Sequence, residues 1–256
     1  MEEENRAKRS VACSDDRLSN LSDELTLHIL SFMSTEEAYR TSVLSKRWAL
    51  ICTNILDLNF NLPTLSEDSV SSKETQSVYA ALLRRNKNIR KLTLIGDFCC
   101  QPHDVHMWIS KALDLNVREL YLDLTLEKKT FLPLRLSASK SLVVLKLAGK
   151  IQFNFTDVYF PSLKILQLTE IVFNSIRDDH KEFGLDFVSR CPRLEEFFIS
   201  DICKQEININ LPLLKRLYLD LVMPDIIYSN AEVGTVKINL LSSLETLLIL
   251  LENMSL

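Results

Sequence analysis

The chain has 256 residues, 46% hydrophobic and 25% charged, which is the composition of a folded globular protein and excludes extensive disorder. Its net charge of −4 at pH 7 argues against a nucleic-acid-binding surface. The four glycines are too scattered for a phosphate-binding Gly-rich loop. Leucine, by contrast, supplies 46 residues, and this excess favours a repeat, a coiled coil or a membrane protein.

A membrane protein is the weakest of these three interpretations. The most apolar stretch, residues 240–251, contains Ser242, Ser243 and Glu245 and is too short to cross a bilayer. The N-terminus is acidic and has no apolar segment typical of a secretory signal. We therefore expect an intracellular protein, in the nucleus, the cytoplasm or both. Its six cysteines should then be free thiols.

Residues 1–14 are polar and unpatterned, and we predict a disordered tail there. Residues 15–60 predict three short helices, capped by Ser22, by Ser34 with Glu37 in a capping box, and by Ser45. The third helix has apolar residues at helical spacing, namely Trp48, Ile51, Cys52 and Ile55. The unit holds 21 apolar residues among 46, more than it can bury alone. Either the rest of the chain or a partner must cover the surplus.

Residues 61–88 predict a linker followed by a helix that caps what comes next. From residue 89 the chain repeats an apolar-x-x-apolar-x-apolar motif at intervals of roughly 20–30 residues. The seven occurrences begin at Ile89, Val117, Leu142, Leu163, Leu194, Leu214 and Leu244. This pattern predicts an α/β fold in which residues 89–256 form an irregular leucine-rich-repeat solenoid of about seven repeats, with parallel strands on its concave face. The alternative is a doubly wound α/β sheet.

Two connections between these motifs predict helices, at residues 105–113 and 185–190. The chain stops seven residues after the last motif, with no polar capping repeat. We expect a product truncated at its C-terminus, because the end repeats of a solenoid usually carry a cap.

One cluster has the side chains of a zinc site: Cys99, Cys100, His103 and His106. Adjacent cysteines lack the spacer that lets two thiolates reach one ion, so we favour a polar loop and expect no metal site. We also find no Gly-x-Ser-x-Gly elbow and no paired nucleophile and base. We expect no catalytic residues, no enzyme activity and no cofactor.

The predicted function therefore lies in binding surfaces. Strand alternation sends the residues between the motif positions to the open, concave face. Aromatic, amide and basic side chains in those columns are our candidates for binding a substrate protein: Tyr121, Lys146, Gln167, Phe198, Arg216 and Tyr218.

Residues 15–60 carry a family resemblance. The segment from Asp16 to Leu25, followed by His28-Ile29-Leu30-Ser31-Phe32, resembles the first half of an F-box. The segment from Glu37 to Trp48 is similar to its second half. The later repeats resemble those of plant F-box proteins with leucine-rich repeats, many of which also carry a C-terminal FBD domain. We expect no FBD domain within these 256 residues.

The resemblance implies a non-catalytic subunit of a Skp–cullin–F-box ubiquitin ligase. Its F-box would dock a Skp-type adaptor, and through it a cullin, while the repeats hold an unknown protein substrate; neither a nucleic acid nor a membrane is an expected partner. By position in the motif, the adaptor-binding candidates are Leu21, Leu25, Ile29, Phe32, Val43, Leu44 and Trp48. Some of these must belong to the internal core, and Trp48 above all.

Three positions depart from the family pattern. Ser22 and Ser34 stand where the family usually has proline, and Cys52 where it often has a second tryptophan. We expect these changes to loosen the approach to the first helix and to weaken adaptor binding by roughly 1–3 kcal/mol. The alternative function is therefore a repeat-based protein-binding scaffold whose degenerate F-box does not join a ligase.

Overall fold

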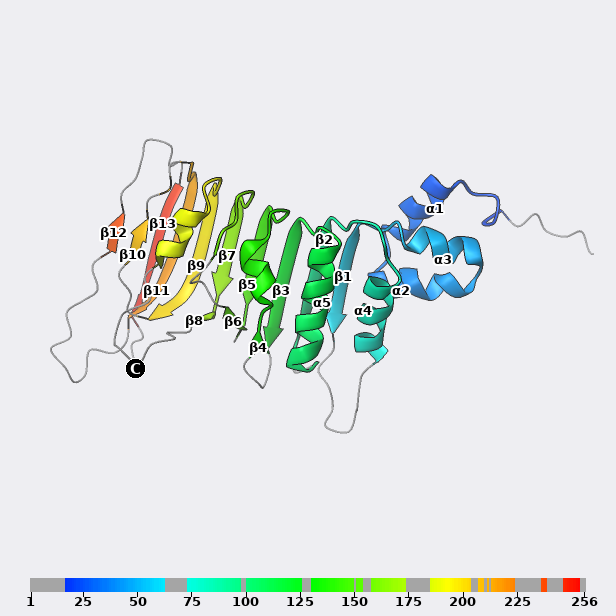
Figure 1. Ribbon diagram of the computed structural model, residues 1–256, viewed down its shortest axis with the longest axis horizontal. Coiled ribbons are helices and arrows are strands. Elements are labelled where there is room, and N and C mark those ends of the chain that lie inside the picture. Colours follow the sequence, from blue (N-terminus) through cyan, green and yellow to red (C-terminus); the bar gives the residue numbers. More distant parts are fainter. Residues whose placement is uncertain are drawn as a thin grey trace, which may run out of the picture.

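N-terminal helices and a long parallel sheet make up the computed structural model, which describes residues 17–62, 73–97, 100–125, 130–149, 151–153, 158–173, 185–203, 207–209, 211, 213–223, 236–238 and 246–253. The helices lie at one end of a row of strands (Figure 1). The predicted tail at residues 1–14 and Cys99 lie outside the described residues.

The three N-terminal helices are α1 (Asp23–Leu30), α2 (Thr35–Arg40) and α3 (Lys46–Cys52). The predicted caps are confirmed: the Ser22 hydroxyl accepts from the Leu25 N–H, and the Ser45 hydroxyl accepts from the Trp48 N–H. Ser34 and Glu37 form the predicted capping box. The second helix is shorter than expected, because a 3-10 helix, η1 (Thr41–Val43), follows it.

The third helix also ends earlier than predicted, and the chain turns directly into a strand. Ile55 is not helical; it is buried just before β1 (Asp57–Leu62), which pairs in parallel with β2 (Lys91–Asp97). The sequence analysis missed this strand because Ile55 also fits the helical spacing of α3. The signal was present, since Ile55, Leu58 and Phe60 repeat the apolar motif once more.

The main sheet has eight strands, and their order in space follows their order in the chain. After β1 and β2 come β3 (Glu119–Thr125), β5 (Val144–Ala148), β7 (Ile165–Thr169), β9 (Glu196–Cys203), β11 (Arg216–Met223) and β13 (Thr246–Asn253). Each of the seven predicted motifs runs into one of these strands. A doubly wound sheet would reverse its strand order part-way. The described strands show no such reversal.

Helices and short strands connect the main strands. The predicted helices are α4 (Lys73–Leu83) and α5 (Pro102–Asp114), whereas residues 185–190 form a 3-10 helix, η3 (Leu185–Arg190). A further 3-10 helix is η2 (Leu134–Ala138). Two small parallel sheets join β4 (Thr130–Phe131), β6 (Ile151–Phe153) and β8 (Val172–Phe173), and β10 (Ile207–Ile209) with β12 (Val236–Ile238). Gly149 at φ 96° turns the chain from β5 into β6, a conformation that suits glycine.

The core of the sheet is a stack of aligned apolar side chains. The strand register puts the second motif residues of successive strands side by side: Leu58, Leu92, Leu120, Leu145, Leu166, Phe197 and Leu217. All seven are fully buried. Each such side chain contributes roughly 1.5–3 kcal/mol when it leaves water. No strand could bury its own face without its neighbours, so the alignment explains why the motif recurs.

Candidate functional site

The end helices expose an apolar face that the rest of the described chain does not cover. Leu25, Ile29 and Phe32 lie along α1 and the turn after it, and Phe32 is 79% exposed. Val43 at the end of η1 is 86% exposed, and Leu44 next to it is also exposed. Exposed large apolar side chains of this kind are typical of a surface that binds a protein partner, and the five residues are together called the exposed apolar face below.

The remaining two adaptor-binding candidates differ from these five. Leu21 is half-buried, and its carbonyl accepts a hydrogen bond from Arg47. The Trp48 side chain is only 7% exposed and belongs to the hydrophobic core. Its inclusion as a partner contact is therefore wrong for this conformation: the ring packs inside the helical unit, the role favoured for it above.

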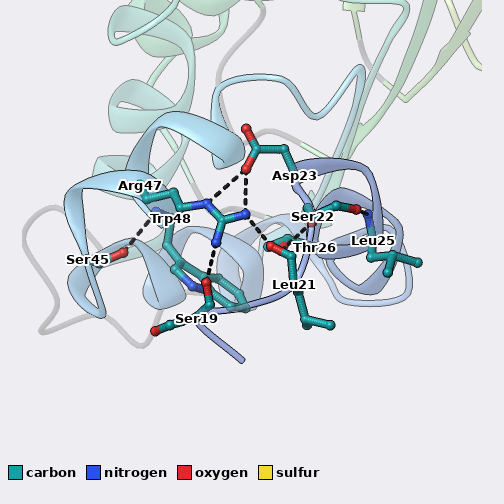
Figure 2. A network of polar contacts seen from close by, with 9 residues as sticks. All are labelled: Ser19, Leu21, Ser22, Asp23, Leu25, Thr26, Ser45, Arg47 and Trp48. Atoms are coloured by element: carbon teal, nitrogen blue, oxygen red, sulfur yellow. Dashed lines mark hydrogen bonds and ion pairs between the residues drawn. The ribbon is translucent and has the colours of Figure 1, made fainter. Parts of the chain in front are cut away.

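Arg47 fixes the segment that leads into α1. Figure 2 shows its guanidinium between α3 and the residues before the first helix. Its Nε donates to Asp23 Oδ1 at 2.9 Å, and its Nη1 donates to the Ser19 carbonyl at 2.7 Å. Its Nη2 reaches both Asp23 and the Leu21 carbonyl. This approach is not loose despite Ser22, because one planar side chain holds three of its residues.

The other two departures from the family pattern also have local explanations. The Ser34 N–H and the Ser34 hydroxyl both donate to Glu37 Oε2, at 3.1 Å and 2.9 Å. These two hydrogen bonds lower the pKa of Glu37. Cys52 is fully buried, and its thiol donates to the Ala38 carbonyl at 3.1 Å. The side chain at position 52 therefore faces the core and not the exposed apolar face. A tryptophan missing from this position is not a missing contact on that face.

A buried arginine ties the helical unit to the sheet. Arg85, just after α4, is 3% exposed and donates to the carbonyls of Cys52 and Ile55. Its Nε donates to the Tyr39 hydroxyl at 3.0 Å, and burial raises the pKa of that phenol. The Cys52 carbonyl is at the end of α3, the Ile55 carbonyl lies just before β1, and the phenol is on α2, so Arg85 joins all three places. The exposed apolar face is thus held in a fixed position relative to the sheet.

Five of the six substrate-binding candidates share one row of the sheet. Tyr121, Lys146, Gln167, Phe198 and Tyr218 occupy equivalent positions on five consecutive strands, β3 to β11. All five are half-buried, as expected for the open face of a sheet. Arg216 lies two residues before this row on β11 and forms an ion pair with Glu196 on β9.

Side chains in this row contact one another. The ammonium groups of Lys91 and Lys146 lie 4.4 Å and 5.2 Å from the centroid of the Tyr121 ring, within the range of cation–π attraction. Burial and the Glu119 carboxylate raise the pKa of Tyr121. The rings of Phe198 and Tyr218 stack with centroids 5.0 Å apart. The row therefore offers a basic aromatic part on β3 and β5, with Lys91 of β2 beside it, and an apolar aromatic part on β9 and β11.

Comparison with known proteins identifies the helical unit. Residues 18–58 match the F-box domain family. An F-box/LRR-repeat protein of Arabidopsis thaliana is 34% identical over 79% of this chain and 44% of its own length. An F-box protein of the same plant is 33% identical, covering 80% of this chain and 65% of its own, and an FBD-associated F-box protein is 32% identical over 80% and 50%.

The chain contains an F-box and is similar over most of its length to plant F-box/LRR-repeat proteins. It spans between about half and two thirds of the length of these relatives. The F-box match begins before α1 and ends at residue 58, inside β1. All five exposed candidates of the apolar face therefore belong to the F-box, and so does Arg47.

The remaining expectations concern metals, thiols and membranes. Within the described ranges, no three His, Cys, Asp or Glu side chains are grouped so that they could hold a metal ion. Burial raises the pKa of the Cys191 thiol to about 12. None of the helices in the described part of the F-box or sheet is long and apolar enough to cross a membrane.

Sequence reasoning did not assign roles to three features. Leu18 and Leu50 are also exposed apolar residues of the F-box, yet neither was selected. Arg47 and Arg85 were missed because an arginine that binds backbone carbonyls leaves no periodic signal. The hydropathy pattern of α4 did predict its apolar face, but Arg85 lies beyond the last apolar position.

Proposed function

We propose that this chain is the substrate-recognition subunit of a Skp–cullin–F-box ubiquitin ligase and does no chemistry itself. The F-box, with the predicted bounds 15–60, docks a Skp-type adaptor, and through it a cullin. The strand array, with the predicted bounds 89–256, is a leucine-rich-repeat solenoid that holds a protein substrate, and residues 61–88 join the two. The complex acts inside the cell, in the nucleus, the cytoplasm or both.

The observation that carries this proposal is the uncovered apolar face of the F-box. Leu25, Ile29, Phe32, Val43 and Leu44 are all exposed, whereas Trp48 and Ile51 of the same domain are buried in the core. This division accounts for the surplus of apolar residues in the F-box sequence. Some of them fill the core, and the others are exposed and available to a partner. Burial of such a cluster against an adaptor helix would supply the apolar centre that stable interfaces need.

The substrate is proposed to bind the row from Tyr121 to Tyr218. Aromatic side chains supply contact area at low entropic cost, and the two lysines beside Tyr121 add positive charge. Arg216 contributes at the margin, because its guanidinium is already paired with Glu196.

Co-expression with a Skp-type adaptor, followed by affinity capture, tests the proposal. The test variant carries Leu25→Asp and Ile29→Asp, which put two carboxylates on the exposed face of α1. The matched control carries Met107→Asp and Leu134→Asp, two exposed apolar residues on α5 and η2, far from the F-box face. We expect the wild type and the control to capture the adaptor and the test variant to lose it by tenfold or more.

Equal capture by all three proteins would refute the proposed face. A folded wild type that captures no adaptor would favour the alternative, a repeat-based scaffold outside the ligase. The family departures at Ser22 and Ser34 motivate that alternative. The contacts of Arg47 and the intact helix caps argue against it, because they hold the F-box helices in place.

A further inference from the structure

A cavity of about 680 Å³ lies along the edge of the main sheet where its strands begin. In Figure 1 this is the edge opposite the arrowheads. Its walls come from the turns before β1, β2, β3, β5, β7 and β9. Five of the lining residues are basic, and none is acidic: Arg90, Arg118, Lys140, Lys164 and Arg193. None of these residues belongs to the concave row proposed to bind a substrate.

The strand register builds this basic edge. The Arg118 N–H donates to the Arg90 carbonyl, and the Lys164 N–H donates to the Val143 carbonyl. The residues directly before successive strands therefore form a row of their own, with neighbouring strands about 4.8 Å apart. Polar groups without charge lie between the cations, including Asn88, which accepts a hydrogen bond from Asn116 at 3.1 Å.

Ion pairs neutralise only part of the cluster. Arg90 pairs with Asp57, and Lys164 pairs with Glu195 at 2.6 Å. Arg118, Lys140 and Arg193 have no ion pair with any described carboxylate, and all three are exposed. The whole chain has a net charge of −4. Three cations without a described carboxylate partner therefore give this cavity a positive charge that is opposite in sign to the charge of the chain.

We propose that this cavity binds an acidic segment of a protein partner, with carboxylate or phosphate groups placed on Arg118, Lys140 and Arg193. The size and charge of the site favour a short segment over a nucleic acid. Nucleic-acid surfaces typically engage some six to ten phosphates, whereas this site offers three free cations on an acidic chain. Arginine forks bind either anion through two parallel hydrogen bonds.

The interaction can be measured on the full chain with a fluorescein-labelled oligoglutamate peptide, by fluorescence anisotropy. A serine phosphopeptide forms a second arm, which separates phosphate from carboxylate recognition, and an oligoglutamine peptide controls for non-ionic binding. The test variant is Arg118→Ala with Arg193→Ala. The matched control is Lys46→Ala with Arg84→Ala, which removes the same charge from exposed residues of α3 and the segment after α4.

We expect the wild type and the control to bind one or both acidic peptides, and the test variant to bind about tenfold or more weakly. Raising salt from about 50 mM to about 200 mM should weaken wild-type binding more than binding by the test variant. Equal affinities of test and control variants would overturn the proposal. Tighter binding of a single-stranded oligonucleotide than of either peptide would also overturn it. So would binding of free tripolyphosphate by a protein that binds neither peptide. None of these measurements involves the adaptor, so they stand apart from the proposed ligase role.

Discussion

Ser22 and Ser34 hold their backbones at φ −65° and φ −61°, close to the value at which proline is fixed. In the family pattern that the F-box resemblance implies, both positions carry proline, so the backbone here is compatible with that pattern although the residue differs. The two serines differ in what they do. The Ser22 side chain caps α1, whereas Ser34 uses both its side chain and its N–H in the capping box.

This difference predicts unequal effects of restoring proline. Ser22→Pro loses one side-chain cap but stiffens the unfolded chain, so stability should change by less than about 1 kcal/mol. Ser34→Pro loses all three hydrogen bonds between Ser34 and Glu37 and should cost about 1–3 kcal/mol. Urea unfolding of the two variants beside the wild type measures both values. Equal losses would mean that the capping box adds nothing beyond a single cap.

At the scale of whole elements, local patterns predicted most of the fold. The helix caps followed from serine and glutamate spacing, and the strands followed from the repeated apolar motif. The failures came where two patterns overlapped or where no pattern exists. Ile55 fits both the helical spacing of α3 and the repeated apolar motif, and only the pairing of β1 with β2 directly after it decides between them. The residues of the basic cavity come from separate turns, so their proximity depends on the strand register and on no local spacing.

The same holds for the candidate surfaces. Strand alternation predicts that these five substrate-binding candidates share one face of the sheet, because period-two geometry needs no tertiary information, and the strand register then aligns them in one row. The F-box motif, in contrast, could not distinguish a core residue such as Trp48 from an exposed residue such as Val43, since both are apolar positions of the motif. Burial separates them: Trp48 is 7% exposed and Val43 is 86% exposed.

Arg85 connects three elements, and its removal should be costly. Arg85→Met leaves the carbonyls of Cys52 and Ile55 buried without this donor, and we expect a loss of about 2–4 kcal/mol. Its exposed neighbour provides the control, since Arg84→Met should change stability by less than about 0.5 kcal/mol. Chemical denaturation of both variants tests this. Similar small effects in both would show that the guanidinium contacts contribute little to stability.

At the scale of the whole molecule, the F-box runs directly into the first strand of the main sheet. The F-box match ends at residue 58, within the first strand of the main sheet. Arg85 adds contacts across the same boundary, and Thr35 at the start of α2 accepts from the Asn59 N–H of β1 at 2.7 Å. A rigid joint would hold a bound substrate at a fixed distance from the ligase, whereas a flexible tether would not.

The two tryptophans allow this rigidity to be tested. The chain has only Trp48, in the F-box core, and Trp108, in α5 against the sheet. Trp108→Phe leaves a reporter in the F-box, and Trp48→Phe leaves one beside the sheet. Losing the Trp108 N–H removes no hydrogen bond, because this buried group has no partner in the described structure.

We expect the fluorescence midpoint in urea to coincide with the circular-dichroism midpoint within each single-tryptophan protein, because coincident probes indicate one cooperative transition. Adding Arg85→Met should separate them, with the F-box reporter changing at lower urea than the dichroism signal. An F-box reporter that melts early without that substitution would contradict a rigid joint. The proposed ligase would then have to position its substrate through a flexible connection, and the contacts around β1 would serve local stability alone.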